Sequence, residues 1–355
     1  MDADVDWWTH PMDARTLWIR QLHQRGDAGT LAGVGEHVVV HERRTRLVCL
    51  DRHEGAVRWD TGIRTRPYDV VTAPAPGPGA GSVLVQENDR LSCLRLTDGD
   101  GVWSVGLPRY CRSPVIAGDT VVTGGWRGYT PLTAFRLVDG RPLWRTPEPA
   151  RTAKPLVWGG GVLVGSGTDV RLIDPGSGQE LSRWRLPEAL TETDHRPAFT
   201  AIGQDRCLAR CGRRSLVTLR LCSGHVEPFL SHDADLAASA AEFAGGVVWV
   251  REARVASDGA CGRLAVAPEN GRVVGRVDVR EPLVGDVVPV PGLVPGAGFA
   301  VVGDSGVLCL LEREGRIVHR IRSRPPGRAL ALRGLGGDLL AVVGRGTLRA
   351  VALTS

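Results

Sequence analysis

The sequence contains almost no lysine. Lys154 is the single lysine, although lysine and arginine together number 44 among the 355 residues. Chemistry through a Schiff base would therefore have to use Lys154 or the N-terminus. Arginine supplies the remaining positive charge, and the formal net charge is only +5. Proteins that bind nucleic acid normally present a denser basic face, so the composition predicts no nucleic-acid partner.

Long apolar runs and a secretory leader are also missing. No stretch approaches the roughly 20 apolar residues that a membrane-spanning helix needs. The first six residues, Met-Asp-Ala-Asp-Val-Asp, lack the basic-then-apolar layout of a secretory signal. Eight cysteines are scattered along the chain, as free thiols in a protein core are. These features predict a cytoplasmic protein that does not associate with a membrane.

The sequence is rich in a short repeat. A small or apolar residue is followed by glycine six positions later and often by tryptophan ten positions later, as in Cys49–Gly55–Trp59. Successive copies lie 38 to 47 residues apart, a period that is typical of propellers and solenoids. Each unit also divides into four short strand-like runs, which in the third unit cover 113–117, 120–123, 132–137 and 141–144. Seven copies begin at Cys49, Cys93, Ala134, Leu172, Thr218, Ala265 and Cys309.

An eighth copy is divided between the two ends of the sequence. Ala350 follows the last complete copy at the expected distance, but neither glycine nor tryptophan follows it. Residues 13–18 supply the missing part, because they end in Trp18 and resemble residues 139–144. Pairing the two ends would remove free sheet edges. We therefore predict an all-β, eight-bladed β-propeller of four-stranded antiparallel blades over residues 13–355, preceded by a tail at 1–12.

The best copy of the repeat identifies a family resemblance. Residues 47–59, Leu-Val-Cys-Leu-Asp-Arg-His-Glu-Gly-Ala-Val-Arg-Trp, resemble the PQQ-like propeller repeat of quinoprotein-type proteins. The resemblance covers about residues 13–355 and implies the fold, but it does not imply an activity. Quinoprotein dehydrogenases of this superfamily typically have adjacent cysteines and a calcium site of Glu, Asn and Asp. This sequence has no adjacent cysteines, and Asn88 and Asn270 both fall in predicted turns. A stand-alone member without cofactor or metal is expected.

One face of the predicted ring should carry the binding residues. We call it the top face; it holds the loops between blades and the loops joining the second and third strands of a blade. A basic residue precedes proline at several blade entries, which predicts a basic arc over blades 2 to 5 suited to a carboxylate or phosphate. Acids would lie opposite, at Asp233, Asp235, Glu281 and Asp286. The alternative is that these charges pair with nearby residues. The basic entries are Arg66-Pro67, Arg112-Ser113-Pro114, Lys154-Pro155, Arg196-Pro197 and Arg324-Pro325.

Aromatic residues gather in the same predicted loops. All three tyrosines fall there, and Trp126 and Arg127 join them in the loop at 125–131. Aromatic and arginine side chains on loops are typical of recognition surfaces, although a locally packed loop without a partner is the alternative. We predict that this face binds an anionic or aromatic small molecule or a partner protein. The predicted binding residues are Arg66, Tyr68, Tyr110, Arg112, Trp126, Arg127 and Tyr129.

A different class of function remains open. The alternative is a cofactor-independent lyase or cyclase of specialised metabolism, with His195, Arg196 and Lys154 at the mouth of the central channel. His232-Asp233 is a further acid–base candidate. A deep pocket holding perturbed titratable groups would favour the enzyme. A flat aromatic rim would favour partner binding.

Two short motifs are better explained by the repeat. Cys207-x3-Cys211, followed by Cys222 and His225, has a zinc-like spacing, but a whole strand should separate Cys211 from Cys222, so no metal site is predicted. Residues 303–306, Gly-Asp-Ser-Gly, match the nucleophile motif of trypsin-like proteases. They fall in a predicted hairpin turn, where such residues are favoured, and no triad partners are identifiable.

Overall fold

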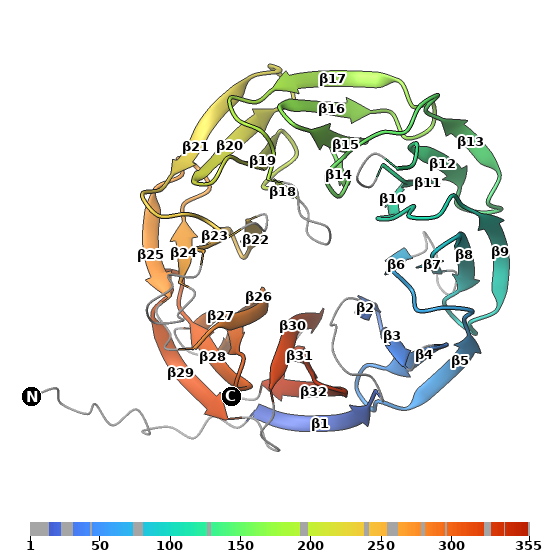
Figure 1. The fold of residues 1–355 in the computed structure, drawn as a ribbon. Helices are drawn as coiled ribbons and strands as arrows, with labels where there is room; N and C mark the ends of the chain where they lie inside the picture. The colour runs from blue at the N-terminus through green and yellow to red at the C-terminus, as the bar shows by residue number, and fades with distance from the viewer. Residues whose placement is uncertain are drawn as a thin grey trace, which may run out of the picture.

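The computed structural model describes residues 14–22, 31–42, 45–73, 81–125, 129–191, 198–237, 241–253, 262–277, 281–294, 297–322, 328–336 and 338–353. These residues form eight four-stranded antiparallel sheets arranged as the blades of a ring (Figure 1). Each blade begins with its innermost strand and ends with its outermost strand, and the eight innermost strands form what we call the inner wall. No helix in the described part of the chain could cross a membrane.

The first four blades follow one another along the chain. Blade 1 consists of β2 (Leu31–Val34), β3 (His37–Glu42), β4 (Arg46–Asp51) and β5 (Val57–Gly62). Blade 2 consists of β6 (Asp69–Ala73), β7 (Ser82–Gln86), β8 (Arg90–Arg95) and β9 (Gly101–Gly106). Blade 3 consists of β10 (Val115–Ala117), β11 (Thr120–Thr123), β12 (Thr133–Arg136) and β13 (Pro142–Arg145). Blade 4 consists of β14 (Leu156–Trp158), β15 (Gly161–Ser166), β16 (Asp169–Ile173) and β17 (Glu180–Arg185).

The remaining blades complete the ring. Blade 5 consists of β18 (Phe199–Ala201), β19 (Arg206–Cys211), β20 (Ser215–Arg220) and β21 (Val226–Ser231). Blade 6 consists of β22 (Glu242–Ala244), β23 (Val247–Arg251), β24 (Arg263–Val266) and β25 (Val273–Val277). Blade 7 consists of β26 (Leu283–Val294), β27 (Ala297–Gly303), β28 (Val307–Leu311) and β29 (Ile317–Arg322). Blade 8 consists of β30 (Ala329–Gly336), β31 (Leu339–Gly344), β32 (Thr347–Leu353) and β1 (Ala14–Gln21).

The two ends of the chain close the ring. The N-terminal strand β1 pairs antiparallel with the C-terminal strand β32, from Ala14 opposite Leu353 to Gln21 opposite Thr347 (Figure 1). The eight-bladed propeller with a composite final blade is therefore confirmed. Closure matters physically because it pairs β32 with a strand of the same chain and leaves no gap between blades 8 and 1.

The hydrophobic core lies between neighbouring blades. One cluster, for example, joins Val39 and Leu47 of blade 1 to Val83 and Val85 of blade 2. Both faces of a blade are covered by its neighbours, so the middle strands are apolar on both faces. Cys49 occupies such a position, and burial raises the pKa of its thiol to about 12. This cysteine is therefore a core residue, as its place in the repeat predicts.

Tryptophans of the repeat connect consecutive blades. The Trp59 indole nitrogen donates a hydrogen bond to the carbonyl oxygen of Leu96, at 2.7 Å, in the next blade. The indole ring lies on Gly99, where an added Cβ would come within 2.5 Å of Trp59 Cε3. Gly99 also has a φ of +77°, so its position requires glycine for two independent reasons. The same arrangement recurs at Trp18, Trp103 and Trp144.

Later blades use closer backbone contact in place of tryptophan. A Cβ added to Gly271 would lie 1.6 Å from the carbonyl oxygen of Phe229 in the preceding blade. A Cβ added to Gly275 would lie equally close to the carbonyl oxygen of Glu314 in the next blade. Trp184 makes the same kind of contact from a shifted position. Its indole nitrogen donates to the Arg220 carbonyl oxygen at 3.1 Å, although Trp184 lies two residues after the tryptophan position of the repeat. At Gly271 the repeat keeps its glycine because the neighbouring blade leaves no room for a side chain.

Candidate functional site

The top-face loops of blades 2 and 3 bring two tyrosines together. Tyr110 lies between β9 and β10, and Tyr129 lies between β11 and β12. Their ring centroids are 5.8 Å apart, with the planes tilted by 51°. Tyr110 is 49% exposed and Tyr129 is 61% exposed. Exposed aromatic rings that contact each other across two loops provide apolar area on a face otherwise built from polar loops.

An arginine and the third tyrosine lie beside this pair. The Arg112 guanidinium carbon lies 4.0 Å from the centroid of the Tyr68 ring. The Tyr68 hydroxyl donates a hydrogen bond to Asn88 Oδ1, at 3.0 Å. A cation over a ring face is stabilised by the ring quadrupole, and the stack orients the guanidinium. We refer to Tyr68, Tyr110, Arg112 and Tyr129 as the aromatic surface.

The loop carrying Tyr110 and Arg112 has an unusual backbone. Tyr110 has a φ of +67° and Ser113 a φ of +59°, and within the described residues these are the non-glycine positions with positive φ. Such conformations are disfavoured for residues with a side chain and persist only where the surroundings hold them. Two strained residues flank Arg112, so its position is fixed by the surrounding structure rather than by local preference.

Buried polar side chains hold this loop. Gln86 is fully buried at the end of β7, and its amide donates a hydrogen bond to the carbonyl oxygen of Cys111, at 2.8 Å. The Thr123 hydroxyl lies 3.0 Å from Gln86 Oε1 and 3.1 Å from the carbonyl oxygen of Arg112. Sequence analysis did not identify Gln86 or Thr123. The only signal for Gln86 is a polar residue that ends an otherwise apolar strand.

The base of the second loop is fixed in a similar way. The Gly125 amide donates to the Thr130 hydroxyl at 3.1 Å, and the Thr152 amide donates to the Gly125 carbonyl oxygen at 2.8 Å. Thr130 also forms an isolated β-bridge with Ala150. Tyr129 therefore extends from a well-anchored base, and rigid anchoring reduces the entropy lost when a ring binds a partner.

The lysine at the entry to blade 4 contacts blade 2. Lys154 Nζ lies 3.1 Å from Asp69 Oδ2, at the start of β6. This ion pair connects the entry to blade 4 with the first strand of blade 2, although blade 3 lies between these blades along the ring. The lysine is paired with an acid that the sequence analysis did not single out. The predicted basic arc is therefore partly neutralised at Lys154.

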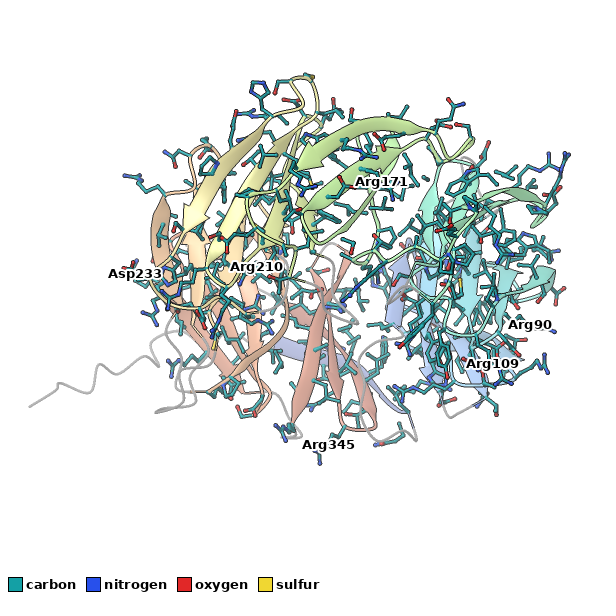
Figure 2. The ribbon with its side chains drawn as sticks, turned by 45° about the horizontal axis from the view of Figure 1, so that its top comes forward. Arg90, Arg109, Arg171, Arg210, Asp233 and Arg345 are labelled. Carbon is teal, nitrogen blue, oxygen red and sulfur yellow. The ribbon has the colours of Figure 1, made fainter. Side chains whose placement is uncertain are left out.

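Two of the four predicted acids are also neutralised. Asp235 is paired with Arg213 and with Arg214, the latter at 3.0 Å. Asp286 is paired with Arg333. At Asp235 and Asp286 the alternative interpretation is therefore correct, because these charges pair with nearby arginines. Figure 2 shows Arg109, which precedes Tyr110, and Asp233 on opposite sides of the ring.

His232 contacts an acid other than the adjacent Asp233. Its ring nitrogen Nε2 lies 3.0 Å from Oε1 of the buried Glu252, and Arg276 lies 3.0 Å from the second carboxylate oxygen. The acid beside His232 is thus Glu252, at the end of β23, and not Asp233. The contact between His232 and Glu252 joins a loop of blade 5 to blade 6, and Arg276 pairs with the same carboxylate within blade 6.

The described residues include some of the predicted site residues and not others. Trp126, Arg127, His195 and Arg196 lie outside the described residues. Arg66 is exposed immediately before β6, two residues from Tyr68. The structure therefore places Arg66, Tyr68, Tyr110, Arg112 and Tyr129 on one sector of the top face, with Lys154 reaching it from blade 4.

The cysteines of the zinc-like motif do not lie together. Cys211 ends β19 and is buried, whereas Cys222 follows β20 and is exposed. Within the described ranges, no three His, Cys, Asp or Glu side chains are placed to hold a metal ion.

The family follows from the repeat and from the matched sequence. The family model described as outer membrane protein assembly factor BamB, a PQQ-like repeat model, matches residues 9–147 and 87–228. The chain belongs to this PQQ-like propeller family. These overlapping matches cover blades 1 to 4 and most of blade 5, and the same architecture continues through blades 6 to 8.

Solved structures share the fold at low sequence identity. The chain is similar to BamB from Moraxella catarrhalis, with a TM-score of 0.69 and 16% identity, covering 96% of this chain and 98% of that one. The quinohemoprotein alcohol dehydrogenase of Comamonas testosteroni gives a TM-score of 0.67 and 14% identity, covering 96% and 76%. The computationally designed protein Ika8 gives 0.68 and 13%, covering 94% and 98%. No curated protein matches the chain. Identities this low establish the fold alone, and this fold suits ligand or partner binding in general.

Proposed function

We propose that this propeller is a binding module that docks a partner protein on its aromatic surface. The observation that carries the proposal is the contact between Tyr110 and Tyr129, two solvent-exposed rings held by different loops. Neither ring occupies a position of the propeller repeat, so the fold does not require them. Tyrosine and arginine are the residue types that dominate binding energy at protein interfaces.

The charge around the aromatic surface indicates the chemistry of the partner. Arg66 and Arg109 are exposed on the adjoining loops, and Arg112 lies within the surface. Two carboxylates at this location are already engaged: Asp69 pairs with Lys154, and the buried Glu87 accepts a hydrogen bond from the Thr65 amide at 2.6 Å. A partner segment that carries acidic and apolar side chains would complement this surface. The name of the family model supports partner binding, because an assembly factor acts on another protein.

The enzyme alternative receives less support. Two of its three residues, His195 and Arg196, lie outside the described part of the chain. The third, Lys154, has its amine in an ion pair with Asp69. An amine held in an ion pair with a carboxylate is a poor nucleophile. No residue near the aromatic surface is therefore assigned a catalytic role.

A peptide-selection experiment tests the proposal. Peptides are selected from a random displayed library on the wild-type protein, and their affinities are measured for Tyr110→Ala, Arg112→Ala and the control Leu181→Ala. Leu181 is 53% exposed on the outer strand β17, so its variant removes similar exposed apolar area elsewhere. We expect selected peptides rich in Asp, Glu and aromatic residues, with an affinity loss of about tenfold, about 1.4 kcal/mol, in the two site variants.

The same experiment can contradict the proposal. Equal affinity of the selected peptides for wild type and for both site variants would show that the aromatic surface is not the docking site. A thermal-shift arm with benzoate addresses the small-molecule alternative. A shift that disappears in Arg112→Ala, together with a failed peptide selection, would replace partner docking by binding of a small aromatic acid.

A further inference from the structure

A cluster of five charged side chains lies on the opposite arc of the ring, outside the aromatic surface. It joins the innermost strands of three consecutive blades, namely β22, β26 and β30. Its three arginines and two carboxylates give a net formal charge of +1. The members are Glu242, Arg251, Arg263, Asp286 and Arg333.

A β-bulge in β26 creates this cluster. The pairing of β26 with β27 is interrupted between Val284 and Val288. Within the bulge Gly285 has a φ of +72°, and a Cβ there would lie 2.0 Å from the backbone nitrogen of Leu332. Glycine is therefore required at this close contact with β30. The bulge places Asp286 against Arg333 of β30.

Two arginines hold the bulge from blade 6. The Gly285 carbonyl oxygen accepts hydrogen bonds from Arg263 at 2.6 Å and from Arg251 at 2.9 Å. Glu242 accepts from Arg263 at 2.9 Å and from the Val287 amide at 2.7 Å. Arg263 is 1% exposed. These contacts make the bulge a rigid support, and rigid support is what a binding group needs to avoid ordering costs.

Arg333 has an unused hydrogen-bonding edge. Its Nη1 contacts Asp286 and the Leu332 carbonyl oxygen, the latter at 3.3 Å. Its Nε and Nη2 make no hydrogen bond with any residue that the structure describes, and the side chain is 37% exposed. The Nε–Nη2 edge of a guanidinium matches the spacing of two oxygens of a carboxylate or phosphate.

We propose that Arg333 binds the carboxylate or phosphate group of a small anionic ligand on the inner wall of the ring, with Asp286 as the acid that modulates its affinity. The ligand's oxygens would accept hydrogen bonds from Nε and Nη2 of Arg333. Asp286 repels the ligand when it is ionised and stops repelling it when it is protonated. This site is separate from the aromatic surface, so it extends the proposed function.

The surroundings of Asp286 set the direction of the pH dependence. Its side chain is 47% exposed, so solvent and ligand can reach it. Desolvation of the covered part of the carboxyl group raises the pKa of Asp286, as does the charge of Glu242, while Arg333 and Arg263 act in the opposite direction. Arg251 adds a further positive charge behind the bulge. As the pH falls through this raised pKa, Asp286 becomes neutral and anion affinity should rise.

Isothermal titration calorimetry with sulfate and with oxalate tests the proposal, and both probes stay dianionic between about pH 6 and about pH 8. Wild type should bind more tightly at the lower pH and take up protons on binding. Asp286→Asn should bind more tightly than wild type at the higher pH and lose the pH dependence. Arg333→Gln should lose about tenfold or more in affinity, and Arg333→Lys should lie between. Preference for sulfate or oxalate distinguishes a phosphate from a carboxylate ligand.

Two controls make the result decisive. Arg136→Gln removes an arginine that pairs with Asp139 in an exposed turn, and it should bind both probes as wild type does. Arg112→Ala should also leave this binding unchanged, which separates the site from the aromatic surface. Unaltered affinity in a folded Arg333→Gln variant, or no gain in Asp286→Asn at the higher pH, would overturn the proposal and leave the ion pair as a contact between blades 7 and 8.

Discussion

Trp18 packs against Gly55 across the joint that closes the ring. A Cβ added to Gly55 would lie 2.5 Å from Trp18 Cδ2, and the Trp18 indole nitrogen donates to the Arg52 carbonyl oxygen at 2.9 Å. The same contact connects blades 1 to 2, 2 to 3 and 3 to 4. The joint between the chain ends is therefore built like an ordinary joint between consecutive blades.

Replacement of Gly55 by alanine should destabilise the protein more than the same change at Gly224. Both glycines have a φ of +68°, but an added Cβ at Gly224 meets nothing within 4 Å. We expect a loss of about 1 kcal/mol for Gly224→Ala from backbone strain alone. Gly55→Ala should lose about 2 kcal/mol more, because the Trp18 ring must move. Urea unfolding measures both, and equal losses would show that the indole contact contributes little.

Replacement of Arg210 by methionine should strongly destabilise blade 5. Arg210 is 2% exposed, and its guanidinium donates to six backbone carbonyl oxygens, including those of Gly212 at 2.8 Å, Arg213 at 2.6 Å and Leu236 at 3.2 Å (Figure 2). These carbonyls belong to two top-face loops. Losing their donor should lower the free energy of unfolding by about 3 kcal/mol or more.

The neighbouring Arg213 provides the control for that experiment. Its side chain is 85% exposed and pairs with Asp235. Arg213→Met should change the free energy of unfolding by no more than about 1 kcal/mol, as exposed ion pairs do. If both variants unfolded at the same denaturant concentration, the carbonyl contacts of Arg210 would not be a source of stability.

Stability should depend on Asp51 in acid. Hydrogen bonds from Arg58 and from the Glu54 and His53 amides lower the pKa of Asp51 from 3.8 to about 2. A lowered pKa in the folded state stabilises the protein at pH values above 3.8, and this contribution disappears as the pH falls toward about 2. The difference in unfolding free energy between wild type and Asp51→Asn should therefore be largest near neutral pH and should shrink across that window. A constant difference from neutral to acid pH would contradict this assignment.

The fold could be predicted from the sequence because its signals are local and repeated. Gly55 and Gly99 mark tight turns with positive φ, and Trp59 at a fixed distance marks the contact with the next blade. The similarity of residues 13–18 to 139–144 was sufficient to predict the pairing of the ends. The grouping of Tyr68, Tyr110 and Tyr129 on one face followed from the same period.

The charge pairing could not be predicted in the same way. Lys154 and Asp69 are 85 residues apart, and His232 contacts Glu252 instead of the adjacent Asp233. Such pairs depend on how far a side chain reaches across a loop and on which carboxylate is already neutralised. The repeat carries no information on either point.

The sequence by itself determined the number of blades, the order of their strands and the closure of the ring, because periodic backbone requirements appear directly as periodic glycine and tryptophan. Only the tertiary structure decided which charges remain available. The stack of Arg112 on Tyr68, the strained backbone at Tyr110 and the open edge of Arg333 arise where segments distant in sequence meet. Contacts of that kind depend on three-dimensional packing, which does not recur from one repeat to the next.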